Sequence, residues 1–95
     1  MRDYVVEFKN PYTFEGEEFS KIDLSGLENL STKDLIEADK QFNTSGQMAL
    51  MNEMTTGYSC IVASKATGKP VEFFEGLPAG EGLKLKNTVM GFLNA

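Results

Sequence analysis

The amino-acid sequence predicts an α+β domain, in which an N-terminal β-hairpin or small meander packs on a bundle of three to four helices. Near the N-terminus apolar side chains recur with a period of two, which is typical of strands. The rest of the chain shows helical spacing interrupted by glycine and proline. Its 95 residues, of which 41% are hydrophobic, suit one domain with a modest core. We therefore expect a single domain over 1–95, with a hairpin region at 1–24 and a helical region at 31–95.

The hairpin region contains β-rich runs on either side of a turn. Residues 4–8 alternate as a strand does, and Asn10-Pro11 predicts that this strand ends there or bends at a sheet edge. Glu15-Gly16-Glu17 predicts a turn, because glycine readily takes positive φ, and 19–24 forms the returning strand. Since an isolated hairpin is marginally stable in water, its apolar face should lie on the helices that follow.

A connector at 25–30 leads to the first predicted helix. Ser31 is a good N-cap, and Asp34 places a carboxylate in the first turn, close to a capping box. One face of this helix should be apolar, with Leu35, Ala38 and Phe42. The segment 43–46 should end it. The next segment, 47–57, is either a loose helical turn or a flexible lead into the following helix, with Thr55 or Thr56 as its cap.

Two closely spaced reversals organise the C-terminal half. The helix predicted over 58–66 is apolar on most faces, so other elements must cover it on several sides. Gly68 is expected to cap it in the left-handed conformation, and Pro70 can open a short helix. Gly76 and Pro78 repeat this arrangement before a last helix over 78–93. Three glycines each weaken that last helix by about 1 kcal/mol relative to alanine, so its first turn should be loose until something packs on it: Gly80, Gly82 and Gly91.

The composition argues against catalysis. The chain has no histidine and one cysteine, which removes the commonest general base and the usual zinc sites. Cys60 lies among apolar residues and is expected to be a small buried hydrophobe. The Gly68-Lys69 pair lacks the earlier glycine of a phosphate-binding loop, and the carboxylates near the hairpin turn should be solvated. We predict that the protein is not an enzyme and uses no cofactor or metal.

Charge and hydropathy set further expectations. A net charge of −5 argues against nucleic-acid binding, which needs a basic surface. No apolar run is long enough to cross a bilayer, and the charged N-terminus does not resemble a signal peptide. We therefore expect a cytoplasmic protein without membrane contacts.

Binding to another polypeptide remains as the expected activity. A methionine-rich cluster is the candidate partner surface, because methionine adapts to irregular partners: Met48, Leu50, Met51 and Met54. The alternative is that these residues cover the core beneath a loop. The apolar stripe of the last helix is a second candidate, for which core packing is the alternative.

Two stretches resemble a known family. The segments VVEFKNPYTFEGEEFSKIDLSGLENLSTKDLIEADK and ATGKPVEFFEGLPAGEGLKLKNTVMGFL are similar, in the order and spacing of their turns and caps, to small tail assembly chaperones of long-tailed bacteriophages and prophages. In that group a strand, a proline, a glycine turn and a second strand precede a capped acidic helix. The distal signature is a Thr-Gly, a short apolar turn, a Leu-Pro and an ending near Gly-Phe-Leu. Gly80 and Gly82 depart from the pattern, as does the methionine-rich middle.

The resemblance implies a function that composition does not. Such proteins bind the long helical tape measure protein, keep it soluble until the tail tube polymerises, and can recruit tail tube protein. They act in the cytoplasm of the bacterial host and are absent from the mature virion; self-association stays open. Two alternatives are a structural head–tail connector or other tail component that remains in the virion, and a small acidic protein-binding regulatory module.

Overall fold

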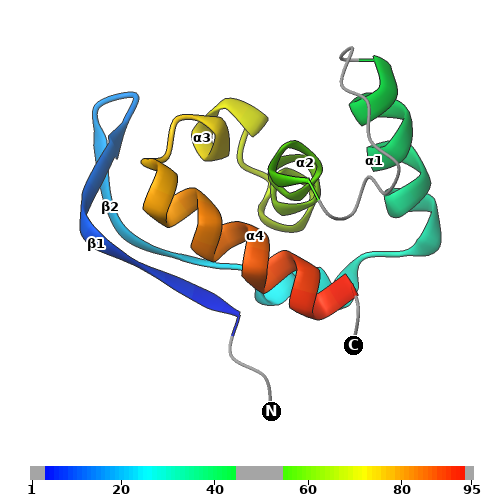
Figure 1. Ribbon diagram of the computed structural model, residues 1–95, viewed down its shortest axis with the longest axis horizontal. Coiled ribbons are helices and arrows are strands. Elements are labelled where there is room, and N and C mark those ends of the chain that lie inside the picture. Colours follow the sequence, from blue (N-terminus) through cyan, green and yellow to red (C-terminus); the bar gives the residue numbers. More distant parts are fainter. Residues whose placement is uncertain (1–3, 45–54, 94–95) are drawn as a thin grey trace.

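The order of the elements along the chain confirms the predicted α+β class. The computed structural model describes residues 4–44 and 55–93. These ranges form a two-stranded antiparallel sheet followed by helices (Figure 1). The elements are β1 (Val5–Phe14), β2 (Glu17–Asp23), the 3-10 helix η1 (Ser25–Asn29), α1 (Thr32–Thr44), α2 (Thr56–Thr67), α3 (Val71–Glu75) and α4 (Ala79–Leu93).

The sheet is a hairpin rather than a meander in the described part of the chain. Its two-residue turn has positive φ at both positions, 50° at Glu15 and 81° at Gly16, which matches the twist of the flanking strands. The pairing runs from Val5 opposite Asp23 to Phe14 opposite Glu17 and is irregular between Glu7 and Tyr12. The strand therefore bends at Asn10-Pro11 and continues, which is one of the two predicted outcomes.

The α2 helix is the centre of the core. Six consecutive residues, 58–63, are buried, because α1, α3, α4 and η1 all contact this helix. Figure 1 shows α2 nearly end-on, with α1 on one side and α3 on the other. As predicted, Thr55 caps its start by accepting a 3.1 Å hydrogen bond from the Tyr58 N–H. Gly68 caps its end with a φ of 78°.

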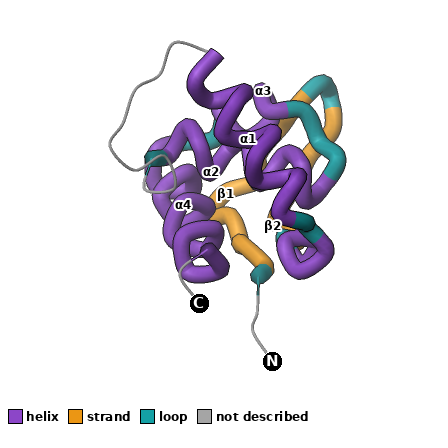
Figure 2. The backbone as a smooth tube through the Cα atoms, turned by 90° about the vertical axis from the view of Figure 1, so that its right-hand side faces the viewer, coloured by secondary structure: helices purple, strands orange, loops and turns teal. Residues whose placement is uncertain are grey.

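The hairpin packs on α3 and α4 through aromatic rings. Phe73 of α3 is 1% exposed and makes edge-on contacts with Tyr12, Phe14 and Phe19, with ring centroids 4.9–5.3 Å apart. At the other end of the hairpin, Tyr4 contacts Phe92 of α4 at 5.9 Å. Both views accordingly place the start of β1 and the end of α4 at the same end of the molecule (Figures 1 and 2).

The stripe predicted on the last helix lies in the core. Leu85 and Val89 are fully buried, and Phe92 and Leu93 are partly buried against the core. The first turn of α4 is helical in spite of its glycines. The Pro78 carbonyl accepts hydrogen bonds from the N–H groups of Glu81 and Gly82. The Glu81 side chain is hydrogen-bonded to β1. We predicted a loose first turn until another element packs on it, and β1 is that element.

Candidate functional site

The predicted partner residues Met48, Leu50, Met51 and Met54 lie outside the described residues. The candidate site that the structure does describe is a groove where the start of α2, the end of α3 and the start of α4 meet. Its volume is about 420 Å³, and we call it the α2–α3–α4 groove. Most of its lining is apolar or lacks a large side chain, and three helices contribute to it: Gly57 and Cys60 of α2, Phe74 and Glu75 of α3, Gly82 and Leu83 of α4.

Leu83, which lines this groove, is an exposed apolar residue. Its side chain is 55% exposed, and among the described residues the other large exposed hydrophobic is Ile36 of α1, at 49%. Single exposed apolar residues are common, but an exposed leucine beside an apolar hollow extends the apolar area that a partner could cover. Sequence periodicity missed this site, because its lining comes from three separate helix ends.

Cys60 lies in the groove lining and is 4% exposed. Burial raises the pKa of its thiol to about 11, and the negative charge of Glu75 adds to this shift. At neutral pH the group is therefore a thiol rather than a nucleophilic thiolate. Its burial matches the prediction that Cys60 is a small buried hydrophobe.

A second cluster lies at the free edge of β1. Glu81 of α4 accepts a hydrogen bond from the Lys9 backbone N–H. Lys84, one turn further on, lies 3.0 Å from the Glu81 carboxylate and donates to the Glu7 carbonyl at 3.2 Å. Lys84 foremost, and then the Lys9 N–H, hold the pKa of Glu81 below its usual value. We call Glu81 and Lys84 the edge clasp.

The edge clasp satisfies backbone groups that an open strand would otherwise offer to another chain. The bend at Asn10-Pro11 adds to this protection, because proline has no N–H to donate. Strand addition at this part of β1 would have to displace two side chains of α4.

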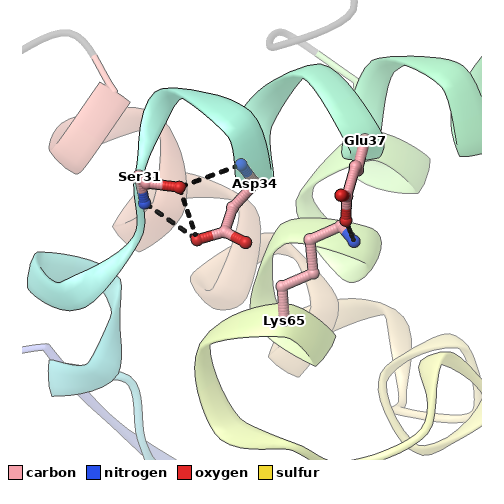
Figure 3. A network of polar contacts seen from close by, with 4 residues as sticks. All are labelled: Ser31, Asp34, Glu37 and Lys65. Carbon is pink, nitrogen blue, oxygen red and sulfur yellow. Dashed lines mark hydrogen bonds and ion pairs between the residues drawn. The ribbon is translucent and has the colours of Figure 1, made fainter.

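The polar contacts around α1 are structural (Figure 3). Asp34 accepts from the Ser31 N–H at 2.8 Å, and the Ser31 hydroxyl accepts from the Asp34 N–H at 3.3 Å, which confirms the predicted cap. The Ser31 N–H foremost, and then the Ser31 hydroxyl, which donates to the Asp34 carboxylate at 3.1 Å, lower the pKa of Asp34. Glu37 forms an ion pair with Lys65 of α2 at 3.6 Å, which links the two helices.

Residues 4–44 and 55–93 lack three kinds of feature: metal-binding clusters, buried polar side chains without partners, and membrane-spanning helices. That part of the chain holds no group of three or more histidine, cysteine, aspartate or glutamate side chains that could bind a metal. In the same ranges every buried side-chain nitrogen or oxygen has a hydrogen-bond partner. None of the described helices is long and apolar enough to cross a membrane.

Comparisons of the chain with models of protein families, with curated proteins and with solved structures find no match. The class of the site therefore rests on its geometry, which is that of an apolar surface groove.

Proposed function

We propose that this protein acts without catalysis, by binding an apolar segment of another polypeptide. The α2–α3–α4 groove carries this proposal, because it combines a mostly apolar lining of about 420 Å³ with the exposed Leu83. The adjacent thiol of Cys60 has a raised pKa and supplies no nucleophile at neutral pH. Burying apolar surface on a partner is then the main interaction that the groove offers.

The resemblance of the two sequence stretches to tail assembly chaperones suggests which polypeptide is the partner. We propose a bacteriophage tail assembly chaperone that binds the tape measure protein and keeps it soluble while the tail tube polymerises. A long helical client exposes apolar stripes before assembly, and a small acidic domain that covers one stripe also adds charge that opposes aggregation. Growth of the tube would compete for the same stripes and release the chaperone. On this proposal the protein acts in the host cytoplasm, can also contact tail tube protein, and is absent from the mature virion.

Co-expression tests the proposal. A cognate tape measure protein is expressed alone, with the wild-type chain, with Leu83→Gln and with Ile36→Gln. We expect the wild-type chain and Ile36→Gln to keep the client in the soluble fraction, and Leu83→Gln to do so less well. The two variants replace similarly exposed apolar side chains, so a difference between them reports on the groove. A client that is equally insoluble with and without the wild-type chain would refute the chaperone function, and recovery of the protein from purified virions would favour a structural tail component.

A further inference from the structure

We propose that the α2–α3–α4 groove seats one bulky apolar side chain of a partner helix, and that this helix carries lysine or arginine on the same face. The proposal rests on the proposed function and specifies the client surface that the groove recognises. Two independent observations support it. One is a glycine that the fold does not require, and the other is a pair of carboxylates without a cation.

The glycine is Gly82, the fourth residue of α4. Glycine weakens a helix relative to alanine, so a reason for its presence is expected. Its backbone is not in the left-handed region. A Cβ atom built on Gly82 meets no described atom within 4 Å, although the residue itself is buried. Neither conformation nor packing among the described residues calls for glycine here.

At two other positions glycine is required because a side chain would clash with neighbouring atoms. A Cβ atom at Gly26 would lie 2.1 Å from the Ala66 carbonyl oxygen, and one at Gly76 would lie 2.6 Å from the Tyr12 hydroxyl oxygen. At Gly82 a methyl group would instead extend into the groove that this residue lines. Gly80 and Gly91 of α4 likewise meet nothing within 4 Å, but they are exposed and lie outside the groove, whereas Gly82 is buried and lines it. The absence of a side chain at Gly82 therefore leaves space in the groove for a ligand side chain, at the expense of helix stability.

The carboxylates are Glu72 and Glu75 of α3. They are three residues apart, so they lie on the same face of that helix, and both are exposed. Neither forms an ion pair within residues 4–44 and 55–93. The nearby lysines have other contacts: the Lys69 ammonium lies over the rings of Phe19 and Phe73, and Lys84 belongs to the edge clasp.

Glu75 also lines the groove, and its charge reaches the Cys60 thiol. A cation on the partner would relieve the repulsion between the two carboxylates. It would also stay at the solvated rim while an apolar neighbour enters the groove. An α-helix places two such side chains together when they are three or four residues apart, which is why we assign a helix as the occupant.

Two synthetic amphipathic peptides of about 18 residues test the proposal, a length at which helices begin to persist in water. Both carry a leucine stripe; one has arginine four residues from the central leucine and the other has glutamate there. We expect the arginine peptide to bind the wild-type chain at least about fivefold more tightly in fluorescence anisotropy at low salt. It should also slow the modification of Cys60 by a thiol reagent, and since this is the one cysteine of the chain the readout is specific.

Three variants assign the effect to named residues. Gly82→Ala should raise the melting temperature, because alanine favours the helix. It should nevertheless weaken the binding of the arginine peptide about tenfold, because the added methyl group occupies space in the groove. Gly91→Ala is the matched control, since it makes the same change in α4 at an exposed position outside the groove, and it should bind as the wild type does. Glu75→Gln should remove most of the preference between the two peptides.

The proposal is overturned if the wild-type chain binds neither peptide or binds both equally, or if Gly82→Ala binds as tightly as the wild type. These outcomes are separable from failure of the chaperone function. A soluble tape measure protein together with unaltered binding by Gly82→Ala would reject the groove specificity and keep the chaperone. An insoluble client together with the predicted peptide preference would reject the assigned client and keep the groove.

Discussion

Replacing Gly26 by alanine tests how closely η1 and α2 approach each other. A Cβ atom at this position would lie 2.1 Å from the carbonyl oxygen of Ala66 and 3.1 Å from its carbonyl carbon, whereas ordinary contacts begin at 3.4 Å. Both obstructing atoms belong to the backbone of α2, so no side-chain rotation can relieve the clash. The two elements must separate by more than 1 Å at this point.

The separation would disturb the residues that η1 anchors. Leu24 and Leu27 flank Gly26 and are both fully buried, so moving η1 loosens their packing. Overpacking a core typically costs about 1–3 kcal/mol, and a backbone obstruction places this case at the upper end, about 3 kcal/mol. For a domain whose total stability is about 5–15 kcal/mol this is a large fraction. It corresponds to a fall in melting temperature of about 12–24 °C.

Thermal and urea unfolding followed by circular dichroism measure this effect. Gly91→Ala is the control, because a Cβ atom there meets no described atom within 4 Å. We expect that control to match the wild type or to be more stable by up to about 1 kcal/mol. A Gly26→Ala variant within about 0.5 kcal/mol of the wild type would refute the inferred close approach.

Three further predictions concern the edge clasp, the cysteine and a helix cap. The folded-state pKa of Glu81 lies below its ordinary value of 4.5, so its contribution to stability is complete above that value and is lost as the pH falls through the lower folded value. The melting temperature of the wild type should thus fall more steeply on acidification than that of Glu81→Gln; parallel curves would exclude the clasp as the cause. With a pKa of about 11, Cys60 should react with iodoacetamide at pH 8 about a hundredfold more slowly than a free thiol, with the rate still rising near pH 10. A rate that levels off near pH 8.5 would contradict its burial. Thr55→Ala removes the hydroxyl that accepts from the Tyr58 N–H and should cost about 1 kcal/mol in urea unfolding, whereas no loss would mean that the cap is dispensable.

Substitution of Gly82 should change the stability of the fold and the affinity for the peptide in opposite directions. The groove proposal expects Gly82→Ala to be the more stable protein by up to about 1 kcal/mol and the weaker binder. Such a trade-off is common where a site needs a locally unfavourable residue. It also means that loss of binding by this variant would not be a consequence of unfolding.

Local signals in the sequence determined the elements and their ends. The hairpin turn at Gly16, the capping box at Ser31 and the left-handed cap at Gly68 were all predicted, because each depends on backbone preferences and hydrogen bonds within a few residues. The central position of the helix at 58–66 was also predicted, because it is apolar on most faces and must be covered by other elements on several sides. The assignment of Met48, Leu50, Met51 and Met54 as a partner surface stays a prediction.

Tertiary structure alone decided which distant residues meet. Glu81 and Lys84 reach β1 across more than seventy residues of chain, and Gly26 meets Ala66 across forty. The groove forms only where the ends of three helices converge around Gly82, a residue that sequence reasoning could register simply as a weak point of its helix. Spacing along a chain encodes which face of an element is apolar, but the packing of whole elements sets which faces become neighbours and which hollow stays open.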